Sequence, residues 1–404
     1  MKKNYTFLLC LTILLNTGLK VQAQTEIRTA EEFAALNDDK TSLSGNYILM
    51  NDLTLNDWIP VGNTEGKDGQ GFSGTFDGNG HTITIIDFSS SFDKPTIGLF
   101  SMIEKEGIVK NLCVAGNVSY EGNQQFLYIG GIAGFNFGLI TCCVSKIEME
   151  GSVNTASGTK EKIKGLLNDD NGAFGGCIVG INRGAITNCY STGMVSILGN
   201  KPSVFAGGIA GRNGIAPKGG LGISIGSGGV GMTVNQAVVT TSDRIINCYS
   251  TASVFSEKIK SSNKLEFVSS GGIAAHNYAT GIIANCVALN EVIGTKSIKV
   301  KPHSMPVPLL SVHNNFYSKD IVYRAYKNGQ EQKPNKYSTN KKATVFSETQ
   351  EESWWQHPEG LTEKQRVQKF GFSFGNDEQS PWVWSDEVKR PVLYWEKTRQ
   401  NGYN

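Results

Sequence analysis

The apolar and polar residues repeat in a fixed order along the middle of the chain. The phrase Gly-Gly-Ile-Ala-Gly-x-Asn at 130–136 is followed, after a turn, by a short apolar segment that ends in cysteine at 140–143. Similar phrases return at 177–189, 207–248 and 271–286. A unit that repeats in this way buries its apolar face only against its neighbours, so the pattern predicts a solenoid. The 47 glycines and the low share of charged residues are typical of a turn-rich β protein.

The spacing inside the repeat predicts a bend. Ile186 and Cys189 are three residues apart, so a straight strand would point them to opposite faces, although both positions stay apolar or small in most copies. We therefore expect a corner at Asn188, with stacked asparagines exchanging amide hydrogen bonds between turns of the solenoid. The paired glycines suit a neighbouring corner. The corner slot holds Asn111, Asn188, Asn247 and Asn285, while Cys142 takes it in one copy.

Four cysteines align in the next slot of the repeat, and Leu112 takes that slot in the preceding copy. A slot that accepts leucine favours an apolar filler, and free cysteine behaves as one. Because neighbouring strands are only ~4.8 Å apart, a disulfide between two turns stays open, whereas a metal would need thiolates that converge on one point. The favoured interpretation is a reduced, buried ladder of Cys143, Cys189, Cys248 and Cys286.

Residues 1–23 have the features of a secretory signal peptide. Lys2 and Lys3 form a basic start, Phe7 to Leu15 a short apolar core, and Val21-Gln22-Ala23 a cleavage site with small residues. No later run approaches the ~18 apolar residues that span a bilayer, so we predict no transmembrane segment in the mature chain. The expected location is secreted, cell-surface or periplasmic.

The segment 24–96 is predicted to hold an N-terminal cap and the first turns of the solenoid. Thr29 and Glu32 have the spacing of a capping box, and Phe33 and Leu36 share one face of the short helix, suited to covering the open end of a β stack. Strands are expected at 47–50, 72–76 and 81–86. Asp77-Gly78-Asn79-Gly80 predicts a tight turn between the last two.

The repeats are expected to fill 97–322, interrupted by a glycine-rich insertion at 213–242, and the last turn is placed at 314–317. The remainder, 323–404, divides into a polar insertion at about 324–342 and a tail with five of the six tryptophans, at 353–395. Insertions in a solenoid leave the stack as loops, often on the binding face. The tail favours a C-terminal aromatic cap, with contact to sugar rings as the alternative.

Charge excludes some partners. Without the three lysines of the predicted signal peptide, 35 basic residues face 36 acidic ones. This balance gives no electrostatic attraction to nucleic acid or to an anionic membrane.

Several short motifs could carry chemistry, and each has a simpler explanation. Gly226 to Gly231 matches the G-x-G-x-x-G pattern, but no strand and helix flank it as a dinucleotide site requires. The cluster of Asp77, Asn79 and His81 fits turn chemistry, and the acidic stretch 168–172 lacks the alternating spacing of a calcium loop. The histidines show no paired spacing of metal ligands; they are His81, His276, His303, His313 and His357.

The chain resembles the GLUG-motif repeat proteins of bacteria. Gly184 to Ser191 and Ile246 to Ser250 match the phrase of that family, and Phe72 to Ile83 and Ile97 to Phe100 match what commonly precedes it. The resemblance implies a parallel β-helix of right-handed twist, a surface or secreted location and a role in adhesion, with no catalytic residues. Similar segments precede the catalytic domain of bacterial metallopeptidases that cleave immunoglobulin A. This chain has no His-Glu-x-x-His, so that protease chemistry does not carry over.

We therefore predict an all-β, single-stranded parallel β-helix with a helical N-terminal cap and an aromatic C-terminal cap. The favoured function is a non-enzymatic exported binding protein whose partners are glycans or host and surface proteins. The alternative is a β-helical carbohydrate-active enzyme, either a polysaccharide lyase or a glycoside hydrolase, with carboxylates paired on neighbouring turns. A component of an envelope assembly is a third possibility. No catalytic, cofactor-binding or metal-binding residue is assigned, and no cofactor is expected.

Overall fold

The fold was analysed in a computed structural model. The predicted signal peptide lies outside the residues that the structure describes. These residues are 24–62, 70–92, 94–122, 126–153, 172–214, 222–226, 229–233, 243–259, 267–278, 280–297, 303–305, 312–313, 315–327, 330–332, 344–346, 351–356 and 372–401.

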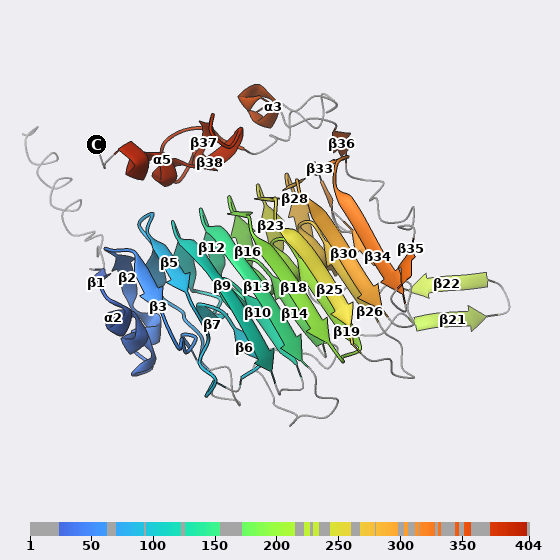
Figure 1. Ribbon diagram of the computed structural model, residues 1–404, viewed down its shortest axis with the longest axis horizontal. Helices are drawn as coiled ribbons and strands as arrows, with labels where there is room; N and C mark the ends of the chain where they lie inside the picture. The colour runs from blue at the N-terminus through green and yellow to red at the C-terminus, as the bar shows by residue number, and fades with distance from the viewer. Residues whose placement is uncertain are drawn as a thin grey trace, which may run out of the picture.

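The chain winds through four sheets in each turn of a solenoid (Figure 1). One turn consists of β10 (Leu127–Gly130), β11 (Ala133–Asn136), β12 (Leu139–Thr141) and β13 (Val144–Val153). Each of these strands pairs in parallel with its counterpart in the next turn, for example Ile140 with Ile186 and Val144 with Tyr190. The predicted all-β parallel solenoid is confirmed, while its handedness stays a prediction.

Within a turn the chain passes from sheet 1 through the asparagine corner into sheet 2, and then into sheets 3 and 4. Sheet 1 contains β1 (Thr25–Ile27), β2 (Asn46–Leu49), β4 (Thr75–Asp77), β8 (Ile108–Lys110), β12, β16 (Ala185–Thr187), β23 (Arg244–Ile246), β28 (Ile282–Ala284) and β32 (Val312–His313). Sheet 2 contains β3 (Leu53–Leu55), β5 (Thr82–Ile85), β9 (Cys113–Gly122), β13, β17 (Tyr190–Ser191), β18 (Met194–Gly199), β24 (Tyr249–Ser250), β25 (Ser253–Lys258), β29 (Val287–Ala288), β30 (Val292–Ser297), β33 (Phe316–Ser318), β34 (Val322–Lys327), β35 (Gln330–Gln332) and β36 (Thr344–Phe346).

The other two sheets close the turn. Sheet 3 contains β6 (Thr96–Ile97), β10, β14 (Gly172–Gly176), β19 (Ser203–Gly207), β26 (Phe267–Gly271) and β31 (His303–Met305). Sheet 4 contains β7 (Phe100–Ile103), β11, β15 (Val179–Asn182), β20 (Ala210–Asn213) and β27 (Ala274–Asn277).

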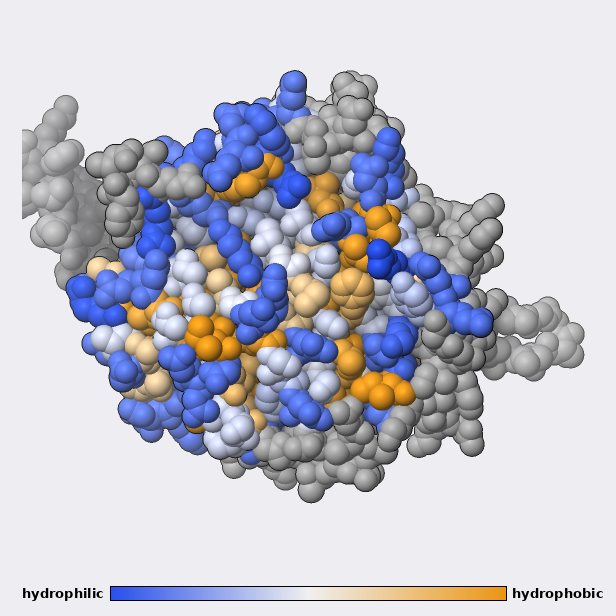
Figure 2. All heavy atoms as spheres, in the orientation of Figure 1, coloured by the Kyte–Doolittle hydropathy of each residue, from blue (hydrophilic) through white to orange (hydrophobic). Residues whose placement is uncertain are grey.

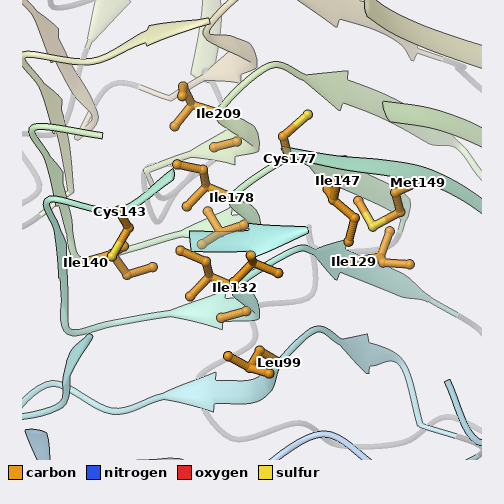
Figure 3. Close-up of a cluster of buried hydrophobic side chains, with 14 of the residues drawn as sticks. Leu99, Ile129, Ile132, Ile140, Cys143, Ile147, Met149, Cys177, Ile178 and Ile209 are labelled. Carbon is orange, nitrogen blue, oxygen red and sulfur yellow. The ribbon is translucent and has the colours of Figure 1, made fainter. Parts of the chain in front are cut away.

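The core is a column of aliphatic side chains stacked turn upon turn. Leu99, Ile132, Ile178 and Ile209 lie at the connection between sheets 3 and 4 and are fully buried (Figure 3). Gly130 precedes this position, and a Cβ there would lie 2.5 Å from the Cα of Val179 in the next turn. The glycine therefore permits the close approach of turns that seals the core.

The predicted bend at the Asn-Cys phrase is confirmed. Asn111, Asn188, Asn247 and Asn285 all have φ between 52° and 56°, as does Cys142 in the same slot. Asparagine tolerates this left-handed conformation better than most residues. The amide of Asn247 donates to Asn188 at 3.2 Å, and Asn285 donates to Asn247 at 3.3 Å. The corner asparagines therefore form the predicted ladder over these turns.

A second asparagine ladder lies at the end of sheet 4, and the sequence analysis did not identify it. The Nδ2 atoms of Asn136, Asn182 and Asn213 each donate to the Oδ1 atom of the next asparagine, at 2.7–2.8 Å, and the series ends at Asn277. These side chains are almost fully buried. Because a buried amide without partners is costly, this ladder fixes the register of successive turns.

The cysteines that align in the repeat are free and buried. The thiols of Cys143, Cys189 and Cys248 each lie 3.1–3.2 Å from the carbonyl oxygen two residues earlier. Cys286 occupies the same position at 3.3 Å. The predicted buried cysteine ladder is confirmed, and its reduced state stays a prediction; no disulfide joins the described cysteines.

The N-terminal helix closes the first turn as predicted. Helix α2 (Ala30–Ala34) begins at Thr29, whose side chain accepts from the Glu32 amide in a complete capping box. Phe33 is fully buried and stacks on Trp58 with ring centroids 5.0 Å apart. The 3-10 turns η1 (Ala35–Asn37) and η2 (Ser42–Ser44) follow.

The predicted tight turn at 77–80 forms, with φ of 50° at Asn79 and 75° at Gly80. It does not join two strands of a hairpin. Strand β4 before it belongs to sheet 1 and β5 after it belongs to sheet 2, each paired in parallel with other turns. The turn is therefore a corner of the solenoid.

The aromatic tail is placed differently from the prediction. It comprises α3 (Glu352–Gln356), β37 (Trp382–Ser385), β38 (Arg390–Leu393) and α5 (Tyr394–Asn401), and it runs back along the side of the solenoid (Figure 1). Trp354 packs against Phe316 near the C-terminal end, whereas Trp395 donates to the Cys142 carbonyl near the other end. The tail is a cover along the corner between sheets 1 and 2 rather than an end cap, because the apolar side chains that need cover, such as Tyr190 and Tyr249, line that corner.

Both predicted insertions contain strands. The polar stretch was expected to leave the stack from about residue 324, but β34 pairs in parallel with β30 and β35 pairs with β34, so the solenoid extends past the predicted last turn. Strand β36 adds a further pair to β33. In the glycine-rich insertion, β21 (Gly222–Gly226) and β22 (Gly229–Thr233) form an antiparallel hairpin that pairs with no other described strand.

Candidate binding face on sheet 2

Sheet 2 carries the longest strands, and their alternation exposes every second residue. On β13, Lys146, Glu148 and Glu150 are exposed while Ile147 and Met149 are buried. The same alternation holds on β9, β18 and β25. The long strands lie side by side, and hydrophilic and hydrophobic side chains are mixed on the face turned to the viewer (Figures 1 and 2). The outward residues of sheet 2 therefore form a broad continuous surface.

One line of outward residues crosses the middle of this surface, from turn to turn. Each member pairs with the next in the parallel register. We call it the central row; its members are Ser119, Glu150, Ser196, Phe255, Gly294 and Arg324.

The ring of Phe255 extends over the next member of the central row, Gly294. A Cβ on Gly294 would lie 2.7 Å from Cδ1 and 2.9 Å from Cε1 of Phe255. The ring therefore lies across the neighbouring strand, over the place where another residue would carry its side chain. Phe255 is half-buried and Gly294 is covered. The partly exposed ring therefore offers apolar surface to a ligand beside a position that carries no side chain of its own.

Polar groups surround this ring. Arg324, the next member of the central row, is exposed. In the adjacent row, Lys296 Nζ on β30 lies 2.6 Å from Glu257 Oε1 on β25. Tyr326 on β34 is the register partner of Lys296 in the next turn. Both ion-pair partners are accessible, so the pair contributes little to stability but offers donors and acceptors beside the ring. An apolar ring face with charged and hydroxyl groups around it suits a ligand that has both C–H and O–H surfaces.

Carboxylates gather at the opposite end of the face. Glu148 and Glu150 point to the same side of β13, about 7 Å apart as expected for alternate residues of a strand. Asn117 on β9 donates to Glu148 at 3.3 Å, and Glu121 is exposed on the same strand. These groups lie on an open surface with solvent access.

The residues that the sequence analysis singled out lie elsewhere. Asp77 accepts from the Asn79 amide at 2.9 Å, as turn chemistry predicts, and also contacts Lys110 at 3.2 Å. His81 contacts Asp52 at 3.1 Å, and the same carboxylate accepts from Arg399 of the tail at 2.9 Å.

These polar groups attach the tail to the solenoid. Burial would raise the pKa of Asp52, but hydrogen bonds from the Thr82 amide, Arg399 and His81 outweigh it and lower that pKa. At the next contact, Lys110 and Asn111 both donate to Glu378, at 2.6 and 2.9 Å. Asp77 and His81 therefore belong to an attachment site for the tail.

The tail tryptophans favour packing over ligand contact. Trp354, Trp355, Trp382 and Trp395 are buried against the corner between sheets 1 and 2. Trp384 is partly buried and its indole nitrogen contacts Asp386 at 3.2 Å. This places the aromatic content of the tail in a hydrophobic cluster, as the favoured interpretation expected.

The remaining motifs show no ligand geometry. The Gly226–Gly231 motif starts in β21 and ends in β22, so it lies in a hairpin and not before a helix. The acidic stretch at 168–171 lies outside the described residues, as does His357, and the side chains of His303 and His313 are not described. Within the described ranges, no group of three or more His, Cys, Asp or Glu residues converges on a point.

Burial raises the pKa values of several core thiols and so lowers their reactivity. Burial raises the pKa of Cys177 to about 12 and of Cys113 to about 11. Burial also raises the pKa of Cys143, Cys189 and Cys248 well above the ordinary value. Because the thiolate is the reactive form, these cysteines fill the core rather than act in redox chemistry.

Sequence reasoning missed the candidate binding face. Phe255 and Gly294 are separated by 39 positions and neither lies in the repeat phrase. The available signal was the alternation of 253–258 and 292–297, but alternation within each strand does not fix the register between the two strands.

Comparisons with known proteins agree with the fold. A crystal structure of a protein from Bacteroides ovatus, named as an immunoglobulin A1 protease, matches with a TM-score of 0.53 over 92% of both chains at 17% identity. Halomucin of Haloquadratum walsbyi is 32% identical over 120 residues, which is 27% of this chain and 1% of halomucin. A Gly-rich membrane protein of Evansella cellulosilytica is 34% identical over 84 residues, 20% of this chain and 9% of that protein.

The solved structure supports the fold and not the activity. The chain spans only a small part of the two sequence relatives, and the identity to the solved structure is low. No family model matches the chain. None of the described helices is long and apolar enough to cross a membrane.

Proposed function

We propose that this chain is an exported, non-enzymatic β-solenoid that binds glycans on the outer face of sheet 2. The observation that carries the proposal is the partly exposed ring of Phe255, whose Cδ1–Cε1 edge fills the side-chain position of Gly294, with Arg324, Glu257 and Lys296 at neighbouring register positions. A pyranose ring has an apolar C–H face and a rim of hydroxyls. The first would stack on the phenyl ring and the second would reach the charged groups.

The scaffold supports a binding role. Its strands place side chains at fixed spacing on a rigid surface, and a rigid surface loses little entropy when a ligand binds. Export rests on the features of residues 1–23, and the resemblance to GLUG-motif proteins supports a secreted or surface location. Adhesion to glycan-bearing surfaces follows as the role of such a protein.

The proposal is tested by glycan-array screening of the mature chain and of Phe255→Ala. We expect the wild type to bind a subset of glycans and the variant to lose them, with unchanged circular dichroism. Tyr120→Phe is the matched control, because Tyr120 points into the solenoid from the same sheet. An array on which the wild type binds nothing would contradict the proposal.

A carbohydrate-active enzyme is the second candidate, and Glu148 with Glu150 favours it. Two carboxylates about 7 Å apart fall within the separation of an inverting glycosidase pair. They lie on an open face, where general acid catalysis by a carboxylic acid lacks the burial that raises its pKa. Polysaccharide panels assayed for reducing ends and unsaturated sugars test this candidate. Product release that disappears in Glu148→Gln or Glu150→Gln would establish it over the binding proposal.

A further inference from the structure

We infer, on the basis of the glycan-binding function proposed above, that the ligand is a neutral linear polysaccharide lying along the solenoid axis over the central row. The inference adds the direction, length and charge class of the ligand to that function. It rests on three properties of the central row: its spacing, its side-chain sizes and its charge.

The spacing of the row matches a chain of sugars. Members of the central row belong to successive turns, which lie about 4.8 Å apart. An extended pyranoside chain advances by a similar distance per residue, so each sugar would meet one turn. Along a strand the outward residues are about 6.7 Å apart, and β25 offers only Ser253, Phe255 and Glu257. The axial direction therefore gives both the better match and the longer contact.

The sizes of the outward side chains also vary along the solenoid axis. The central row contains the small residues Ser119, Ser196 and Gly294. On β18, Ser196 lies between the larger outward residues Met194 and Leu198. Gly294 likewise lies between Val292 and Lys296 on β30, and the ring of Phe255 covers it. Because Glu150, Phe255 and Arg324 separate these small residues, a chain along the axis would meet a larger side chain at every second turn and would find room over Ser119 and Ser196.

The charges of the row favour a neutral ligand. Glu150 lies toward one end and Arg324 at the other, so the row itself has no net charge. Glu121 and Glu148 flank Glu150, and the ammonium group of Lys296 is paired with Glu257. A polyanion spanning the row would meet three carboxylates at the Glu150 end. Hydroxyl groups can instead donate to Glu150 and accept from Arg324, so a neutral chain fits both ends.

Calorimetric titration with oligosaccharides of increasing length tests the inference. The probes are cello-, xylo-, manno- and laminari-oligosaccharides of two to six residues, with oligogalacturonides of the same lengths as acidic comparators. We expect one neutral series to bind, with affinity rising at least tenfold from dimer to hexamer. The acidic series is expected to bind more weakly at every length.

Three variants separate the axial arrangement from a local sugar site. Phe255→Ala should weaken binding of all lengths at least tenfold. Arg324→Ala, two turns away, should weaken binding of the hexamer more than binding of the dimer. Ser253→Ala, beside Phe255 on the same strand but outside the row, should change neither.

The outcomes distinguish this inference from the function on which it rests. Equal affinity for dimer and hexamer, or an Arg324→Ala effect that is the same at all lengths, would overturn the axial arrangement while Phe255-dependent binding upholds the proposed function. Stronger binding of oligogalacturonides would overturn the neutral class in the same way. If neither these series nor the array binds the wild type, both the inference and the proposed function fail.

Discussion

The ring of Phe255 lies across Gly294 of the neighbouring strand, where a Cβ would come within 2.7 Å of Cδ1. The two residues pair in the register of β25 and β30. Because the Phe255 ring fills the side-chain position of Gly294, it forms an apolar surface that extends over two strands, here called the platform, in a row whose other side chains are polar. The proposed function depends on this platform, so it can be tested from either residue.

Gly294→Val should abolish the platform without unfolding the protein. The new side chain would displace the Cδ1–Cε1 edge of the Phe255 ring, which can rotate away. Valine suits a strand, so we expect the unfolding free energy to change by less than about 1 kcal/mol. Glycan affinity should fall at least tenfold in calorimetric titrations. Unchanged affinity in a folded variant would show that the ring position does not matter.

Asn182→Ala should be far more destabilising than Asn247→Gly. Asn182 accepts from Asn136 and donates to Asn213 in the buried ladder, so its loss leaves two buried amides short of partners and should cost about 2–4 kcal/mol. Asn247 is only partly buried and has φ of 56°, which glycine adopts freely, so its replacement should cost about 1 kcal/mol or less. Urea-unfolding midpoints of both variants check the ranking, and equal midpoints would contradict it.

The buried thiols should be inaccessible to Ellman's reagent in the folded protein. Burial raises the pKa of Cys189 well above the ordinary value and that of Cys177 to about 12. We expect almost no reaction under native conditions. After unfolding in guanidinium without reductant, all seven cysteines that follow the predicted signal peptide should react. A smaller number in the unfolded state would reveal a disulfide.

His276 should make stability depend on pH. Burial, with a smaller effect of Arg212, lowers the pKa of His276 to about 4 from 6.5. Above pH 6.5 the residue is neutral in both states. As the pH falls from 6.5 to 4, only the unfolded chain gains the proton, so stability falls by up to about 3 kcal/mol. His276→Phe, which keeps a ring against Phe205, should lose less stability than wild type between pH 7.5 and 4.5 in thermal melts. An identical loss in both proteins would show that other groups are responsible.

The tail should be held by its aromatic contacts rather than by its ion pairs. Trp395→Ala removes a buried indole and its hydrogen bond to the Cys142 carbonyl, and should cost about 3 kcal/mol or more. Arg399→Ala breaks a partly exposed pair with Asp52 and should cost about 1 kcal/mol or less. Limited proteolysis should release the tail faster in Trp395→Ala than in Arg399→Ala. The reverse order would assign the attachment to the ion pairs.

Much of the fold was predictable because the residue types in each repeat determine its local geometry. The asparagine slot requires a residue that tolerates positive φ, and Leu112 in the cysteine slot indicates a core position. Thr29 and Glu32 similarly predicted the capping box. In each case local physical chemistry determines the structure, so the sequence of a single turn is sufficient to predict the feature.

The candidate face and the position of the tail were not predictable for a different reason. The apolar content of 353–395 shows that this segment covers something, but not which surface it covers. The pairing of Phe255 with Gly294 depends on the register of two strands in successive turns, and the alternation of each strand does not fix that register. Each of the four repeat phrases ends in an asparagine at the position of Asn136. The sequence does not show that these side chains point inward and bond to one another along the stack.

Titration of wild type and Phe255→Ala with the oligosaccharide series that the wild type binds tests the central claim most directly. The account predicts micromolar to millimolar binding by the wild type and at least a tenfold loss in the variant, with equal melting temperatures. Binding of the same affinity by both proteins would contradict it.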